Sequence, residues 1–255
     1  MKTLAIVQAR MTSTRLPGKV LLPILGKPML VLQLERMRRA KALDGIVIAT
    51  TTNSADDPIV SLARQEEVAC FRGSEPDVLS RYAGAAQAYA ADTIVRITSD
   101  CPLMEPGLID QAVDAFVQAN GKLDYASNML QPSFPYGLAV EVFSRQALDQ
   151  AHGEAKLDAE REHVTPYIYW RPEQFRILSI RHLSDLSHHR WTVDTPEDFE
   201  LVSRIFSALY PANAQFNMQQ VLQLLEDHPD WMAINSHIDQ IIPQATDPLK
   251  KKASA

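Results

Sequence analysis

The chain has 255 residues, of which 46% are hydrophobic and 22% charged, and it carries a formal net charge of −6. A chain of this length can form one large α/β domain, or a domain with a small appendage, and can bury a substantial core. Its composition excludes general disorder. Two cysteines, Cys70 and Cys101, exclude a disulfide framework, and no stretch approaches the roughly 18 apolar residues that a membrane span requires.

Short β-rich runs alternate with longer segments of helical period in the first half of the chain. Strands are predicted at residues 4–9, 45–51, 68–71 and 93–97, and helices at residues 29–40, 58–66, 77–89 and 108–119. Prolines at positions 58, 76 and 106 mark three strand-to-helix junctions. This alternation predicts a parallel sheet with helices on both faces, and it directs attention to the carboxyl ends of the strands.

The second half is less regular. Strands are predicted at residues 124–127, 140–143, 175–179 and 190–193, and helices at residues 144–151, 159–169, 196–209, 218–226 and 230–238. Because no Pro/Gly/Ser-rich linker interrupts the chain, we expect one domain over residues 1–240 and a flexible tail over residues 241–255. The N-terminus lacks the apolar core of a secretory leader, so a cytoplasmic location is expected.

Cations are concentrated near the N-terminus, around the loop that follows the first predicted strand. The first 34 residues contain five basic side chains and no acidic one: Lys2, Arg10, Arg15, Lys19 and Lys27. A basic patch on an acidic protein concentrates anions. Because the cations sit in one loop and the rest of the surface should repel a long polyanion, the pattern favours a small polyphosphate over nucleic acid.

The chain contains neither a P-loop nor a Gly-x-Gly-x-x-Gly turn. Phosphate is therefore expected to be held by side chains, with Arg10, Arg15 and Lys19 supplying charge and Ser13 and Thr14 supplying hydroxyls.

Two aspartates, Asp100 and Asp194, each follow a predicted strand. Two carboxylates, together with phosphate oxygens and water, form the all-oxygen site that Mg²⁺ prefers. The alternative is that each aspartate caps a following helix, which is plausible locally for Asp194 before Thr195 and Pro196.

The loop at residues 10–19 resembles the signature of the cytidylyltransferases that activate acidic sugars: the CMP-Kdo and CMP-sialic acid synthetases and their SpsF-type relatives. The resemblance continues in order through residues 72–74, 77–82, 98–103, 137–143, 160–166 and 191–198, and spans about residues 3–235. The SpsF-like branch fits best. It implies a three-layer α/β/α fold of the nucleotide-diphospho-sugar transferase type, Rossmann-like, with a mostly parallel sheet.

The same resemblance implies a Mg²⁺-dependent nucleotidyltransferase. The enzyme would transfer CMP from CTP to a sugar, sugar acid or related small acceptor, with pyrophosphate release, for surface polysaccharide synthesis. Arg10, Arg15 and Lys19 would act on the leaving phosphates, and Asp100 and Asp194 would hold the metal. The nucleotide-binding residues would be Ala9, Arg10, Ser13, Ser74, Asp77 and Arg81. Asp77 has an alternative role as a helix N-cap, and Arg81 as its ion-pair partner.

By resemblance, the acceptor binds to an inserted segment at about residues 125–185. The candidates are Asn128, Tyr136, Glu141, Glu160 and His163. His163 is either a general base or a structural histidine. Residues 135–139 lack the charged residues that relatives commonly carry there, so the acceptor half of the site departs from the family pattern.

A homodimer is a family expectation. Two other functions remain open: a glycosyltransferase or a transferase of another NTP on the same fold, and a nucleotide-binding relative without turnover.

Overall fold

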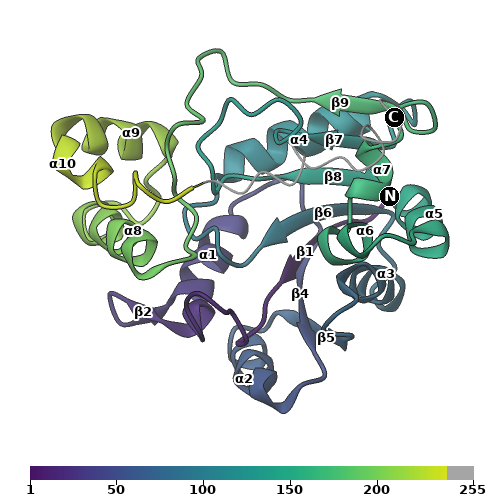
Figure 1. Cartoon of the computed structure of the whole chain (residues 1–255), viewed down its shortest axis with the longest axis horizontal. Coiled ribbons are helices and arrows are strands. Elements are labelled where there is room, and N and C mark those ends of the chain that lie inside the picture. Colours follow the sequence, from purple (N-terminus) through teal and green to yellow (C-terminus); the bar gives the residue numbers. More distant parts are fainter. Residues whose placement is uncertain (240–255) are drawn as a thin grey trace, which may run out of the picture.

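The computed structural model describes residues 1–239 and contains a seven-stranded sheet in the order β5-β4-β1-β6-β8-β7-β9. Its strands are β1 (Thr3–Gln8), β4 (Gly45–Thr51), β5 (Ala69–Gly73), β6 (Thr93–Thr98), β7 (Tyr125–Ser127), β8 (Glu141–Ser144) and β9 (Ile177–Ser179). β5, β4, β1 and β6 are parallel, β8 is antiparallel to β6 and β7, and β9 is parallel to β7. β2 (Pro23–Ile24) and β3 (Lys27–Pro28) form a separate hairpin. In Figure 1 the sheet descends from β9 to β5.

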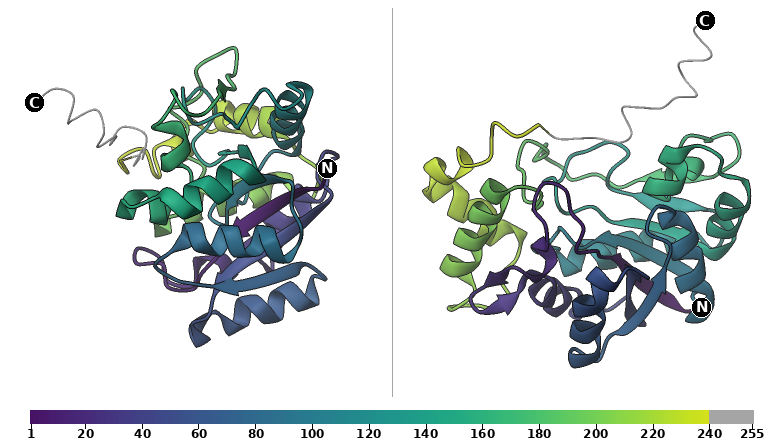
Figure 2. Two further views of the ribbon diagram at one scale, coloured as in Figure 1. Left: turned by 90° about the vertical axis from the view of Figure 1, so that its right-hand side faces the viewer. Right: turned by 60° about the horizontal axis from the view of Figure 1, so that its bottom comes forward.

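Helices cover both faces of this sheet. They are α1 (Met29–Met37), α2 (Asp57–Gln65), α3 (Val78–Ala88), α4 (Pro106–Gln118), α5 (Arg145–Glu154), α6 (Asp158–His163), α7 (Pro166–Tyr169), α8 (Pro196–Leu209), α9 (Met218–Asp227) and α10 (Pro229–Met232). One apolar cluster contains residues of α1, α2, α4, α8 and α9, and the other contains residues of α3, α5 and α7. Figure 2 shows α3 and α5 side by side on the second face. The predicted three-layer, mostly parallel fold is confirmed.

Successive side chains of a strand point to opposite faces of the sheet, so one strand contributes to both clusters. In β1, Ala5 and Val7 belong to one cluster while Leu4 and Ile6 belong to the other, as the two-residue period of a strand requires. No helix among residues 1–239 is long and apolar enough to cross a membrane.

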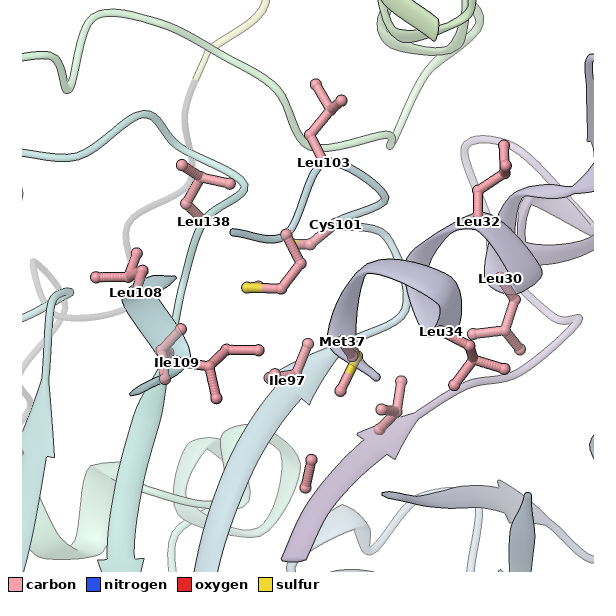
Figure 3. Close-up of a cluster of buried hydrophobic side chains, with 14 of the residues drawn as sticks. Leu30, Leu32, Leu34, Met37, Ile97, Cys101, Leu103, Leu108, Ile109 and Leu138 are labelled. Carbon is pink, nitrogen blue, oxygen red and sulfur yellow. The ribbon is translucent and has the colours of Figure 1, made fainter. Parts of the chain in front are cut away.

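The first cluster also fixes the chain on both sides of Asp100. Ile97, Cys101 and Leu103 are each at most 3% exposed. Figure 3 shows them among apolar side chains of α1 and α4. The backbone that carries Asp100 is therefore anchored in the core.

The strand predicted at residues 190–193 is wrong, because these residues make only a single bridge, between Arg190 and Tyr136. Trp191 and Thr192 donate their backbone N–H groups to the Tyr136 carbonyl (2.6 and 3.2 Å), while Val193 donates to the Asp100 carbonyl (2.8 Å). Since these backbone groups bond to two different segments, no ladder with one partner strand forms.

Two predicted helices differ from the structure: one is divided and one is shorter. The helix predicted at residues 159–169 divides into α6 and α7, because Val164 has a positive φ (72°) that a right-handed helix does not allow and Pro166 has no N–H to continue the helix. The helix predicted at residues 230–238 is helical only in α10. The tail predicted at residues 241–255 lies outside the described residues.

Candidate active site

Hydrogen bonds hold the loop of residues 9–18 in place after β1. The Met11 N–H donates to Asp56 Oδ1 (2.7 Å), and the Gly18 N–H donates to the Met11 carbonyl (2.9 Å). Asp56 is fully buried, and Gly18 adopts a left-handed conformation (φ 71°). The loop is thus closed at its base, so its cations project from a fixed frame.

Lys19 joins this loop to both predicted metal ligands. Its Nζ donates to Asp194 Oδ1 (2.9 Å), to the Val193 carbonyl (2.7 Å) and to Asp100 Oδ2 (3.3 Å). Burial on its own would lower the pKa of Lys19, but the two carboxylates outweigh burial and hold the pKa above the usual lysine value. Burial would likewise raise the pKa of Asp100, and Lys19 holds it below the usual value. The Lys19 ammonium and the Asp100 carboxylate are therefore both charged near neutral pH.

Asp194 faces two further cations. Its Oδ2 lies 3.0 Å from Arg15 Nη2 and 3.3 Å from Arg190 Nη2. Asp194 does not cap a helix, because the N-cap residue of α8 is Thr195. Asp100 does not cap one either, because the N-cap residue of α4 is Glu105. The capping alternative is therefore wrong for both aspartates, and their carboxylates face the cationic loop instead.

Asp198, which the sequence reasoning did not select, fixes the segment that carries Asp194. It is fully buried and accepts from Arg190 Nε and Nη2 (both 2.8 Å) and from the Asp194 N–H (2.9 Å). Its sequence signal is the Thr195-x-x-Asp198 capping box at the start of α8.

A close backbone approach at Gly137 brings the predicted acceptor segment against residues 190–193. A Cβ at Gly137 would lie 2.4 Å from the Thr192 nitrogen and 2.6 Å from the Trp191 carbonyl carbon, and φ is +113°. Only glycine fits there without a backbone shift.

Replacing Gly137 with alanine is therefore expected to destabilise the fold by about 2 kcal/mol or more. Gly153→Ala is the matched control, because a Cβ at that helical position meets nothing within 4 Å. The check is the urea unfolding midpoint of both variants. An unchanged midpoint for Gly137→Ala would contradict the steric argument.

A pocket of about 530 Å³ lies at the carboxyl ends of β1 and β6. Of the predicted residues, it is lined by Ala9, Arg10, Ser13, Thr14, Arg15, Lys19, Arg81, Asp100, His163 and Asp194. The sequence reasoning missed other residues on its wall, among them Gln8, Glu75, Thr98, Ser99 and Glu162. Their sequence contains no motif that marks them as site residues, because polar residues near strand ends commonly just face solvent.

Two predicted nucleotide-binding residues, Ser74 and Asp77, do not line this pocket. The Asp77 carboxylate caps α3 by accepting from the Ser80 N–H (2.9 Å), and it pairs with Arg161. Arg81 donates to the Ser74 carbonyl (2.8 Å) rather than to Asp77. The N-cap alternative for Asp77 is thus confirmed, and the predicted Asp77–Arg81 pair is wrong.

A second pocket of about 150 Å³ adjoins the first and shares Thr98, Asp100 and His163 with it. Tyr136 and Glu141 line this second pocket.

Asn128 and Glu160 line neither of these two pockets. Asn128 bonds to backbone groups of Leu138 and Val140, and Glu160 accepts from the N–H groups that precede α6 and pairs with Arg171. Both residues therefore hold neighbouring parts of the chain in place.

The donor set of the first pocket fits Mg²⁺. Within residues 1–239 there is no group of three or more His, Cys, Asp or Glu side chains that could hold a metal by themselves. Mg²⁺, however, is commonly held by one or two carboxylates together with phosphate oxygens and water. The Lys19 ammonium already lies between Asp100 and Asp194, so a positive charge is accommodated at this point.

The family model for cytidylyltransferases matches residues 4–226. The chain belongs to the cytidylyltransferase family.

Three curated relatives of this family cover most of the chain. An uncharacterised protein of Methanocaldococcus jannaschii is 39% identical over 242 residues (94% of this chain and 97% of the relative). The spore coat polysaccharide biosynthesis protein SpsF of Bacillus subtilis is 32% identical over 234 residues (89% and 95%). A 3-deoxy-manno-octulosonate cytidylyltransferase of Solibacter usitatus is 32% identical over 251 residues (81% and 95%). These relatives confirm the SpsF-like resemblance, and this family makes the chain a nucleotidyltransferase.

Solved cytidylyltransferases have the same fold. A cytidylyltransferase from Leptospira borgpetersenii superposes with a TM-score of 0.88 at 33% identity, covering 94% of this chain and 99% of that one. A CMP:2-keto-3-deoxy-manno-octonic acid synthetase complexed with CTP superposes with a TM-score of 0.62 at 15% identity, covering 82% and 99%. The second likeness shows the fold alone.

Proposed function

We propose that this cytidylyltransferase is a cytoplasmic, Mg²⁺-dependent enzyme that transfers CMP from CTP to a small hydroxyl-bearing acceptor for surface polysaccharide synthesis. The observation that carries the proposal is the three-way contact of Lys19 with Asp100 and Asp194 on the wall of the larger pocket. The name of the SpsF relative and the CTP in the structure of a synthetase with this fold support it.

In the proposed reaction, an acceptor oxygen forms a bond to the α-phosphorus of CTP while the bond from phosphorus to the bridging oxygen of the β-phosphate breaks. Pyrophosphate leaves, and the hydroxyl proton is lost. Such transfer depends on alignment and charge neutralisation. Arg10 and Arg15 are exposed on the pocket wall, where they would bind the leaving phosphates. Mg²⁺, held by Asp100 and Asp194, would neutralise charge on the phosphate oxygens.

His163 is proposed as the group that accepts the hydroxyl proton, because it lines both pockets. Burial lowers the pKa of His163 below the usual histidine value, outweighing the opposing effect of Glu162 and Glu141. The imidazole is therefore neutral near pH 7 and able to accept a proton.

Turnover is accordingly expected to fall as pH falls through the lowered pKa of His163, with the acidic limb below about pH 6.5. A general base accepts a proton only when it is unprotonated, so turnover rises with pH up to the pKa of His163. His163→Gln is expected to lose this limb and about a hundredfold in rate. The measurement is the pH profile of pyrophosphate release. Retention of both the rate and the limb in His163→Gln would remove His163 from this role.

The proposed function is tested by pyrophosphate release from CTP, UTP, ATP and GTP, with Mg²⁺ or EDTA, against sugars, polyols, sugar acids and sugar phosphates. Release that needs both CTP and Mg²⁺ is expected. Release of nucleoside diphosphate from a nucleotide-sugar would instead identify a glycosyltransferase. CTP binding without release for any acceptor would identify a binding protein.

A further inference from the structure

The smaller pocket beside Asp100 has the size of a single ring. Its volume is about 150 Å³, and it opens beside the larger pocket through the shared residues Thr98, Asp100 and His163. A cavity of about 150 Å³ accommodates a benzene-sized molecule. An acceptor whose reacting oxygen lies beside Asp100 would therefore place a body of about six ring atoms here.

Among the described residues, the charged side chains that line this pocket are Arg96, Asp100 and Glu141. Arg96 Nη1 donates to Glu141 Oε2, and Asp100 pairs with Lys19. Each of the three lining charges therefore already has a partner of opposite sign. The described side chains of the pocket wall thus offer no cation whose charge is left to balance a ligand anion.

Glu141 is held as a fixed counter-ion. Its side chain is 5% exposed, and its Oε1 accepts from the Tyr125 hydroxyl (2.6 Å) and the Thr165 hydroxyl (2.5 Å), while Oε2 accepts from Arg96. With both oxygens bonded and nearly no exposure, Glu141 is not placed to accept an acceptor proton. Glu141 affects a ligand by neutralising the positive charge of Arg96.

Arg96 keeps hydrogen-bonding capacity after this pairing. Its Nε is buried and has no partner within the described part of the chain. An uncompensated buried donor is costly, whereas an oxygen placed beside it recovers that cost.

We propose that this pocket selects an acceptor whose body is uncharged and polyhydroxylated, and that the Arg96–Glu141 ion pair excludes acidic bodies. A carboxylate or phosphate buried here would lose its hydration without gaining a counter-ion, because the charge of Arg96 is already compensated by Glu141. This inference rests on the proposed function, because it concerns the acceptor of the same reaction. It narrows that acceptor to neutral sugars, cyclitols or short polyols in the part that enters the pocket.

The test compares matched pairs in which a hydroxymethyl group is replaced by a carboxylate: glucose and glucuronate, sorbitol and gluconate, ribitol and ribonate. Pyrophosphate release from CTP with Mg²⁺ gives kcat/KM for each compound, and calorimetry with CMP-saturated enzyme gives the affinity of each. We expect the neutral member to exceed the acid by at least about tenfold in either measurement. An acid that equals or exceeds its neutral partner overturns the proposal.

Glu141→Gln tests the cause. Removing this counter-ion frees the charge of Arg96, so the neutral-to-acid ratio is expected to fall by at least about tenfold through gain of acid binding. Asp149→Asn is the matched control, since it removes the same charge from an exposed ion pair on α5 and should leave the ratio unchanged. A ratio in Glu141→Gln equal to that of the wild type overturns the role of the ion pair.

Glu141→Gln leaves a largely buried cation without its partner, which is expected to destabilise the fold. A double variant without either charge keeps the proposal testable if Glu141→Gln does not fold. In the double variant Arg96→Gln/Glu141→Gln both charges are absent, and we expect weaker use of neutral acceptors with no gain of acids. A gain of acids in the double variant overturns the proposal. Absence of release with every acceptor despite CTP binding would refute the proposed function instead, whereas release that favours acids would refute only the present inference.

Discussion

Lys19→Met is expected to lose about 10²–10³-fold in turnover and to bind CTP far more weakly, while its affinity for CMP changes little. The reason is that the Lys19 ammonium serves two sets of anions. It lies between Asp100 and Asp194 in the free protein and on the wall of the pocket where the leaving phosphates would bind. Pyrophosphate release and calorimetric titration with CTP and CMP provide the measurements.

The same variant should lose about 1–3 kcal/mol of stability without metal, because Lys19 is buried and both of its carboxylate partners would remain. Excess Mg²⁺ should restore part of this loss by replacing the missing charge. Arg15→Met is the control: Arg15 is exposed and makes one ion pair, so CTP binding should weaken while stability stays within about 0.5 kcal/mol. Equal losses of CTP and CMP affinity in Lys19→Met would contradict its action on the terminal phosphates.

Asp194→Asn is expected to lower turnover by about a hundredfold or more with little change in stability. Each cation around Asp194 keeps another partner or solvent: Lys19 keeps Asp100, Arg190 keeps Asp198, and Arg15 is exposed. Removing one carboxylate therefore strands no buried charge, but it removes half of the protein's proposed metal ligands. The checks are turnover across a Mg²⁺ titration and Mn²⁺ binding to the protein followed by EPR.

Asp198→Asn supplies the contrast. Asp198 is fully buried, binds Arg190 through two hydrogen bonds and accepts from the Asp194 N–H. The free energy of unfolding is therefore expected to fall more in Asp198→Asn than in Asp194→Asn. Wild-type turnover of Asp194→Asn at saturating Mg²⁺ would exclude Asp194 from the metal site.

In the first half, the strands of the large sheet and the helices could be predicted because each is specified locally, whereas the short β2–β3 hairpin was missed. Apolar runs mark β1, β4 and β6, and Pro58 and Pro106 mark the starts of α2 and α4. The second half was harder because its pairing depends on distant segments. Residues 190–193 have the composition of a strand, yet their backbone groups bond to Tyr136 and Asp100 instead. Pro166 was a signal that the helix predicted at residues 159–169 would break.

The candidate site could be predicted in part for the same reason. Arg10, Arg15 and Lys19 follow from the cationic loop and Asp100 from the end of β6. Asp194 was predicted from a strand that does not form, yet one pocket brings all five residues together. Asp77 shows the limit: its partner Arg161 lies 84 residues away along the chain. No local pattern distinguishes a carboxylate that faces a ligand from one that caps a helix and pairs with a distant arginine.

The backbone link between Asp100 and the segment before Asp194 joins parts of the chain that are far apart in sequence. The Thr192 hydroxyl and the Val193 N–H reach the Asp100 carbonyl across a separation of 92 residues or more. The neighbouring pairing of β1 with β6 closes a similar separation, because Thr3 pairs with Thr93. Because chain entropy is lost before such long-range contacts form, we expect this chain to fold slowly for its size. A chain cut before residue 190 would keep the cationic loop and Asp100 but lack Asp194, and with it half of the proposed metal ligands.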